Sequence, residues 1–157
     1  AWCVGDTLSE MEKLCLASFQ HYDHTVQLYV YEPPAGVPNG IELMDAEKVL
    51  PRRSIFKYKD RDTYAGFANL FRYKLLLEKG GIWIDMDMIC LNPFIFQEPY
   101  VFASENPHGV TNSMIKVPPG AEVMQFCYDR AVSFDPRDIR WGMTGPALLR
   151  SAVDHFD

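Results

Sequence analysis

The stretch from Thr63 to Asp85 constrains the fold more than any other part of this 157-residue chain. Apolar side chains recur at helical spacing from Thr63 to Lys79, and further leucines widen the stripe, which predicts a long, largely buried helix. Gly80-Gly81 follows, and one of these glycines is expected to take the left-handed conformation that ends many helices. The apolar run from Ile82 to Asp85 then predicts a buried strand. Helix, tight loop and buried strand form half of a parallel crossover unit, so the sequence predicts an α/β fold.

Two carboxylates stand at the exit of this strand, in the sequence Asp85-Met86-Asp87. Residues two apart on an extended chain point the same way, and open α/β sheets bind ligands at the carboxyl ends of their strands. A D-x-D taken alone is as often a solvated turn. Here the flanking residues are apolar, and two carboxylates among them require donors or a cation. The pair therefore indicates Mn²⁺ or Mg²⁺, with substrate phosphates filling the remaining coordination positions.

Asn69 and Arg72 form the clear polar pair of the preceding helix. They are three residues apart and so share a face. The alternative is an ordinary surface pair, but their neighbours in the chain are apolar, which favours a position lining a cleft. There the guanidinium group offers a planar fork to phosphate or sugar oxygens.

The rest of the chain alternates between weaker strand and helix patterns. Ser9 and Glu12 fit a capping box that opens a helix to about Gln20. Strands are predicted at 1–4, 26–31, 41–43, 101–103 and 113–117, and helices at 121–132 and 147–156, with a helical turn at 45–50 and a surface loop at 51–61. No linker or repeat divides the chain, so we expect a single domain over residues 1–157.

Composition excludes several functional classes. A net charge of -6 gives no field to attract nucleic acid, although a metal could still bring a nucleotide-sized ligand. The four cysteines have no C-x-x-C spacing, which indicates buried thiols rather than a zinc cluster. No apolar window is long enough for a transmembrane helix. A cytoplasmic protein is expected, and a luminal catalytic fragment remains the alternative.

The four histidines do not form a recognisable catalytic or metal-binding set. His21 and His24 are close in sequence but have no further ligand nearby, and His108 and His155 are isolated. No Ser-His-Asp arrangement can be assembled from the sequence. The glycine-rich signatures of dinucleotide and P-loop sites are also missing, so redox chemistry and P-loop NTP hydrolysis lose support.

Together these motifs resemble a known family. The segments 67–76 and 78–87 are similar to the sugar-binding region of the DxD-containing retaining glycosyltransferases, which include capsular-polysaccharide sugar transferases, yeast-type initiating mannosyltransferases and clostridial glucosylating toxins. Trp2-Cys3-Val4-Gly5 resembles the Trp-x-x-Gly at the start of these domains. Residues 141–146 contain their downstream Thr-Gly-Pro element.

The resemblance implies a GT-A fold, a Rossmann-like nucleotide-diphosphosugar domain with a mostly parallel central sheet flanked by helices. It implies a sugar transfer from a nucleotide-diphosphate donor, with UDP-sugar expected, to a carbohydrate or other hydroxyl acceptor, with retention of configuration. By residue, it implies that Asp87 binds the metal directly, Asp85 contacts ribose and a metal-bound water, Asn69 and Arg72 hold the sugar, and Trp2 lies beside the base. It identifies no catalytic nucleophile.

Two departures from the family pattern matter. Asn69 stands where relatives usually have Asp, so an expected carboxylate acceptor has become an amide. The chain also ends at Asp157, soon after Thr-Gly-Pro, where relatives commonly continue, so the fold is expected to be truncated or minimal at its C-terminus. His155 is the only conventional late metal ligand and is not expected to serve.

Two alternatives remain open. A haloacid-dehalogenase-like phosphatase also places D-x-D after an apolar strand, but that motif normally continues Gly-Thr, whereas Met88-Ile89 follow here. A non-catalytic nucleotide-sugar-binding domain is favoured by Asn69 and the early C-terminus. Release of phosphate from phosphomonoesters, release of UDP from UDP-sugars, or binding without either would distinguish the three.

Overall fold

A computed structural model describes residues 1, 5–106, 109–135 and 137–156. The helices and strands, in chain order, are α1 (Glu10–His21), β1 (Gln27–Val30), β2 (Glu42–Asp45), α2 (Ala65–Lys79), β3 (Gly81–Ile84), β4 (Val101–Asn106), β5 (Gly109–Val117), α3 (Glu122–Val132) and α4 (Pro146–Phe156). Two short 3₁₀ helices, η1 (Ala46–Lys48) and η2 (Arg52–Ser54), connect β2 to the loop that precedes α2. Within the described residues, no helix is long and apolar enough to cross a membrane.

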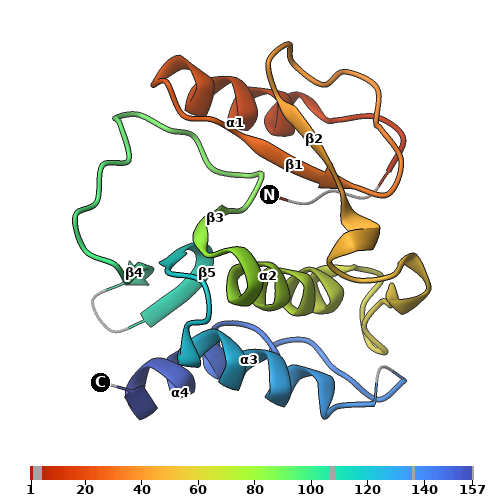
Figure 1. The fold of residues 1–157 in the computed structure, drawn as a ribbon. Helices are drawn as coiled ribbons and strands as arrows, with labels where there is room; N and C mark the ends of the chain where they lie inside the picture. Colours follow the sequence, from red (N-terminus) through yellow and green to blue (C-terminus); the bar gives the residue numbers. More distant parts are fainter. Residues whose placement is uncertain (2–4, 107–108, 136, 157) are drawn as a thin grey trace.

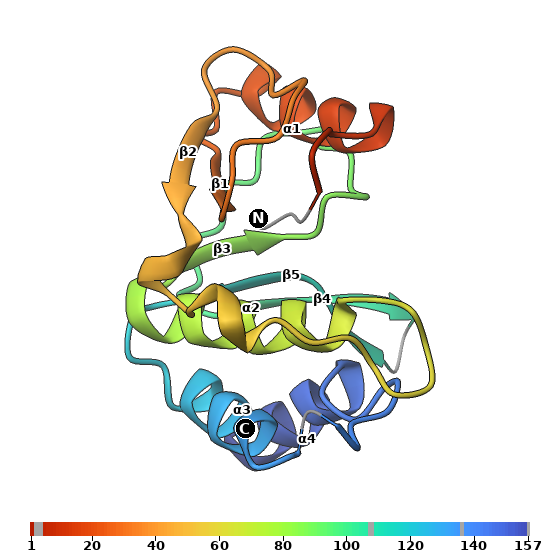
Figure 2. The same cartoon turned by 90° about the vertical axis from the view of Figure 1, so that its right-hand side faces the viewer.

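The elements stack in layers around α2. Figures 1 and 2 show α2 between a unit made of α1, β1 and β2 on one side and the pair α3 and α4 on the other. Two hydrophobic clusters correspond to this layering. One surrounds α2 and reaches α3 and α4, with Phe67 and Phe71 fully buried in it. The other joins α1 and β1 to the end of β3.

The strands form two small sheets. β1 pairs with β2 in parallel, and β3, β5 and β4 form an antiparallel sheet with β5 in the centre. The predicted single, mostly parallel sheet is therefore not what the described strands form. The difference arises because β4 and β5 make a hairpin whose second strand runs antiparallel along β3, a long-range pairing that the short apolar runs at 101–103 and 113–117 do not specify.

The predicted strand at 1–4 lies mostly outside the described residues. Ala1 is described, and its backbone contacts β1: its amino group donates to Gln27 O at 3.3 Å, and its carbonyl accepts from the Tyr29 N–H at 3.0 Å. Trp2 and Cys3 lie outside the described part of the chain. The other three cysteines are free and buried, as predicted.

The capping box at the start of α1 is confirmed. The Glu12 N–H donates to Ser9 Oγ at 3.3 Å, and the Ser9 N–H donates to Glu12 Oε2 at 2.7 Å. Together these bonds satisfy two backbone donors, one at each end of the box. One turn further along, α1 contacts the exit of β3, where the Cys15 thiol donates to Asp85 O at 3.6 Å.

The junction of α2 and β3 is the second confirmed prediction, with one correction. Gly80 has φ 63° but ψ -153°, which only glycine adopts readily and which is not the left-handed helical conformation that we expected. Its N–H donates to Leu76 O at 2.8 Å, which closes the last turn of α2. Gly81 also has a positive φ, and β3 begins there. This sharp reversal brings the end of β3 back along α2.

Candidate donor-binding site

The predicted site residues lie in one pocket. A cavity of about 760 Å³ is lined by Asn69 and Arg72 from α2 and by Asp85 and Asp87 after β3. Its other walls are the first turn of α1, the middle of β5 and the loop that precedes α4. The pocket therefore forms where these five parts of the chain, far apart in sequence, meet beside the carboxyl end of β3. Trp2, the remaining predicted donor-binding residue, lies outside the described residues.

Asp85 is held by two donors. Arg72 NH2 lies 2.5 Å from Asp85 Oδ1, and Trp83 Nε1–H donates to the same oxygen at 2.8 Å. The Arg72 guanidinium also lies over the Trp83 ring, 4.8 Å from its centroid. The charge of Asp85 is thus balanced by an almost fully buried arginine before any ligand binds. The donors required by its apolar surroundings come from the protein itself.

The two terminal nitrogens of the Arg72 guanidinium each bind a protein group. Its NH1 donates to Asn69 Oδ1 at 2.8 Å, while NH2 serves Asp85. Within the described part of the molecule, Arg72 Nε is buried and has no hydrogen-bond partner. Arg72 therefore fixes the relative positions of Asn69 and Asp85.

Asn69 is the centre of a buried polar network. Its amide nitrogen lies 3.5 Å from Tyr58 OH and 3.4 Å from Thr144 Oγ1. Its carbonyl oxygen accepts from Arg72 and also from Asn112 Nδ2 at 3.1 Å. Both sides of the amide are therefore used, which links α2, β5 and the Thr-Gly-Pro segment through one side chain.

Asn112 on β5 is a pocket residue that the sequence analysis missed. It is 4% exposed, and its Nδ2 donates to Asn69 Oδ1 and to Tyr73 OH at 3.0 Å. Its Oδ1 is buried without a partner among the described residues. The available signal was a run of three polar residues, Thr111 to Ser113, within a strand whose later part is apolar.

The Tyr73 phenol supports Asn112 as a neutral group. Its hydroxyl donates to Thr144 O at 2.8 Å. Burial raises the pKa of Tyr73 well above its ordinary value, so the phenol keeps its proton in the physiological range. A tyrosine that stays protonated can donate to one partner and accept from the other at once.

Asp87 differs from Asp85 in its surroundings. Its side chain is exposed at the pocket, and no protein hydrogen bond or ion pair to it occurs among the described residues. Across the same residues, no three His, Cys, Asp or Glu side chains gather closely enough to hold a metal ion by themselves. Two carboxylates without a full protein shell suit a hard ion that keeps waters and binds substrate phosphates.

The Cys15, His24 and His155 side chains do not line this pocket and contact other protein groups instead. Burial raises the pKa of the Cys15 thiol to about 11, so it is a neutral thiol and not a nucleophile or soft metal ligand at neutral pH. His155 stacks on Phe126, with ring centroids 5.4 Å apart. His24 accepts the Phe94 N–H at 2.9 Å. His108 lies outside the described residues.

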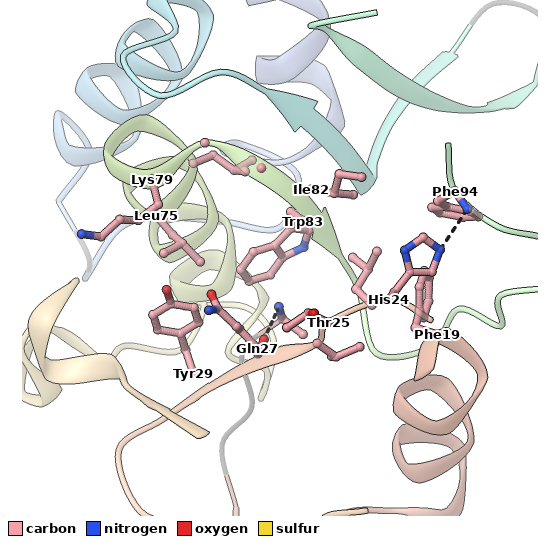
Figure 3. A pocket seen from close by; sticks show the side chains of 16 residues that line it. Phe19, His24, Thr25, Gln27, Tyr29, Leu75, Lys79, Ile82, Trp83 and Phe94 are labelled. Atoms are coloured by element: carbon pink, nitrogen blue, oxygen red, sulfur yellow. Dashed lines mark hydrogen bonds between the residues drawn. The ribbon is translucent and has the colours of Figure 1, made fainter. Parts of the chain in front are cut away.

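A second cavity is lined by β1, the end of α2 and the whole of β3. It measures about 360 Å³, and Leu75 and Phe94 also line it. Figure 3 shows Trp83, Leu75 and Tyr29 around it and the hydrogen bond between His24 and Phe94. Its lining contains no carboxylate, so it lacks the chemistry of the acidic pocket.

Comparison with known proteins agrees with this geometry. A family model described as a glycosyltransferase sugar-binding region containing a DXD motif matches residues 3–126. A solved structure titled PaToxG Glycosyltransferase is similar over 99% of this chain with a TM-score of 0.73 and 16% sequence identity. The similar region is 66% of that structure, slightly less than two thirds of its length. At this identity the likeness concerns the fold alone. No curated protein sequence matches the chain.

Proposed function

Because the chain belongs to the family of glycosyltransferase sugar-binding regions that contain a DXD motif, we propose that it transfers a sugar from a UDP-linked donor to a hydroxyl acceptor. The observation that carries the proposal is the meeting of Asp85, Asp87, Arg72 and Asn69 in one pocket. Carboxylates for a cation and amide and guanidinium groups for sugar and phosphate oxygens are the chemistry that a nucleotide-diphosphate sugar requires.

The residues present fit a divalent cation, Mn²⁺ or Mg²⁺. Asp87 is an exposed carboxylate in the pocket, and the second oxygen of Asp85 remains after Oδ1 has bound Arg72 and Trp83. We propose that Asp87 binds the ion directly and that Asp85 contacts ribose and a metal-bound water. When bound, the ion would stabilise negative charge on the departing diphosphate.

The chain's own residues would orient the donor. Arg72 Nε and Asn112 Oδ1 are buried polar atoms without partners in the described structure. A buried polar group without a partner costs about 1–3 kcal/mol, so a ligand that supplies the partner is favoured. Arg72 Nε would donate to a phosphate or sugar oxygen, and Asn112 Oδ1 would accept from a sugar hydroxyl. Asn69 would hold Arg72 and Asn112 in place through its hydrogen bonds to both.

Three finer expectations belong to the same proposal. The sheets would be parts of a GT-A domain that spans residues 1–157, Trp2 would lie beside the nucleotide base, and transfer would retain the anomeric configuration. Retention follows from the resemblance alone, and no residue is assigned as nucleophile. A cytoplasmic location and a role in polysaccharide biosynthesis likewise stay predictions.

A non-catalytic nucleotide-sugar binder is the second candidate, favoured by Asn69 in place of the usual Asp. The phosphatase alternative loses support beside the family match. In that alternative Asp85 would be the nucleophile, yet its Oδ1 is bound by Arg72 and Trp83. UDP release from UDP-sugars separates a transferase from a binder, since the binder would release none.

The test of the metal site is the binding of UDP in Mn²⁺ by calorimetry. Asp87→Ala should weaken UDP binding by about tenfold or more, because the ion loses its direct protein ligand. The matched control is Asp154→Ala, which removes an exposed carboxylate on α4 and the same formal charge. The assignment is wrong if UDP binds Asp87→Ala as well as it binds the control.

A further inference from the structure

The Trp141 side chain forms part of the wall of the acidic pocket and is half exposed. Its exposed fraction is 51%, whereas Trp83 beside Asp85 is 3% exposed. Single exposed apolar side chains are ordinary on protein surfaces. Trp141 is different because it lines the same pocket as Asn69 and Asp85 and because several contacts hold it there.

The segment that carries Trp141 is fixed to the loop before α2. The Trp141 N–H donates to Asp60 Oδ1 at 3.2 Å, and the Arg61 guanidinium lies 4.7 Å from the indole centroid. The Tyr58 ring meets the indole edge to face, with centroids 5.7 Å apart and planes at 66°. The ring is therefore held by its backbone and by two neighbours while half of it stays open. The Arg61 guanidinium covers one face of the ring, so a ligand would contact the part of the indole that Arg61 and Tyr58 leave open.

A chain of contacts places Trp141 relative to the acidic pair. Asp85 binds Arg72, Arg72 binds Asn69, Asn69 reaches Tyr58, and Tyr58 packs on Trp141. If the diphosphate binds at the acidic pair and the donor sugar at Asn69, Trp141 is the next ring in this series of contacts, and we take its side of the pocket as the acceptor side.

The chemistry of the pocket indicates what the acceptor is. Its lining combines hydroxyl, amide, carboxylate and guanidinium groups with the Trp141 and Tyr58 rings and with apolar side chains such as Met86. A lipid acyl chain would leave the polar groups of this lining without hydrogen-bond partners, whereas the hydroxyls of a sugar can supply them. A pyranose ring has hydroxyls at its edge and weakly positive C–H groups on its face, which suit polar neighbours and the negative face of an indole.

We propose that Trp141 is the acceptor platform, on which the sugar ring of a carbohydrate acceptor stacks. The role of this surface as an acceptor site rests on the proposed transferase function. The stacking contact itself needs neither donor nor metal, so it can be tested separately.

The test is saturation-transfer NMR with methyl α-glucoside, methyl α-mannoside and methyl β-galactoside and no nucleotide. With wild type, at least one glycoside should show saturation on its ring C–H protons. Trp141→Ala should lower the affinity for that glycoside by about tenfold. Trp141→Phe keeps an aromatic face and should lower the affinity much less. The control Tyr100→Ala removes another half-exposed ring, one that lines a different groove, and should change nothing.

Calorimetry of UDP in Mn²⁺ on the same variants separates this inference from the proposed function. UDP affinity should be the same in Trp141→Ala and wild type. Absence of UDP binding by wild type would overturn the proposed function, while the glycoside result would still decide the stacking contact. Three results would each overturn the proposed role of Trp141. They are equal glycoside affinity in Trp141→Ala and wild type, no glycoside binding by wild type, and an equal loss of UDP and glycoside affinity in Trp141→Ala.

Discussion

Arg72 joins the polar network around Asn69 to the acidic end of β3. Its guanidinium donates to Asn69 and Asp85 and lies over Trp83, while its buried Nε has no hydrogen-bond partner among the described residues. Arg presents these donors in one rigid plane, whereas the Lys ammonium is a compact point charge on a flexible stem. The planarity of Arg72, as well as its charge, therefore sets the distance between α2 and the end of β3.

Arg72→Lys tests this role at the residue scale. The charge stays, but one ammonium cannot reproduce the two directed bonds, so we expect the free energy of unfolding to fall by about 2 kcal/mol. UDP affinity in Mn²⁺ should fall by about tenfold as Asp85 and Asn69 shift. Thermal melts and calorimetry measure the two effects. Arg130→Lys, at an exposed position on α3 that packs on Phe134, is the control. A lower melting temperature with unchanged UDP affinity per folded molecule would make Arg72 a structural residue only.

At the scale of elements, the turn between α2 and β3 brings the polar face of the helix to the acidic pair. A Cβ on Gly80 would lie 2.5 Å from Pro119 N and 2.8 Å from Pro118 C, which are backbone atoms that cannot move aside as a side chain can. A Cβ on Gly81 would meet nothing within 4 Å. An alanine at Gly81 would therefore add backbone strain alone, whereas an alanine at Gly80 would add strain and steric overlap.

Gly80→Ala and Gly81→Ala form a matched pair for urea denaturation. Both positions have a positive φ, so each alanine should cost about 1–2 kcal/mol of backbone strain. Gly80→Ala should cost at least about twice as much, because the methyl group also overlaps the Pro118-Pro119 backbone. Equal losses would show that this contact relaxes freely and does not fix the turn.

Local patterns predicted the elements better than their pairing. The capping box, α2, the Gly-Gly turn and the strand before the acidic pair follow from residue spacing within one segment, and the structure has all of them. The β4–β5 hairpin was missed as a unit, because strand pairing depends on contacts between distant segments. For the same reason Asn112 was missed: its position opposite Asn69 depends on the register of β5 against β3.

At the scale of the whole molecule, the pocket lies at the seam between the two hydrophobic clusters. Phe71 and Trp83 belong to the cluster around α2, and Cys15 and Ile84 belong to the cluster under α1. Asp85 follows Ile84 directly, so both clusters hold the strand end that carries the acidic pair. Loss of packing in either cluster should therefore also displace the strand end that carries the acidic pair.

Each cluster also contains a cysteine whose burial raises its pKa, to about 11 for Cys15 and to about 12 for Cys127, from an ordinary value of 9.0. A pKa that is higher in the folded state means that the fold favours the protonated thiol. The associated stability is complete below pH 9 and is lost as the pH rises through the folded-state values. Burial acts in the same direction on Tyr31, whose pKa is raised to about 12 from 10.0.

We therefore expect the urea midpoint to fall steadily above about pH 9, with a loss of at least about 1 kcal/mol by pH 11, since one pKa unit corresponds to about 1.4 kcal/mol. Cys127→Ala should be less stable than wild type at pH 7, because it leaves a small cavity, yet lose less between pH 9 and pH 11. Cys15→Ala should show the same change more weakly, because its pKa is raised less. Denaturation series at pH 7, 9, 10 and 11 measure both slopes. A wild-type midpoint that stays constant to pH 11, or variants that fall as steeply as wild type, would mean that the two thiols ionise without opposing the fold.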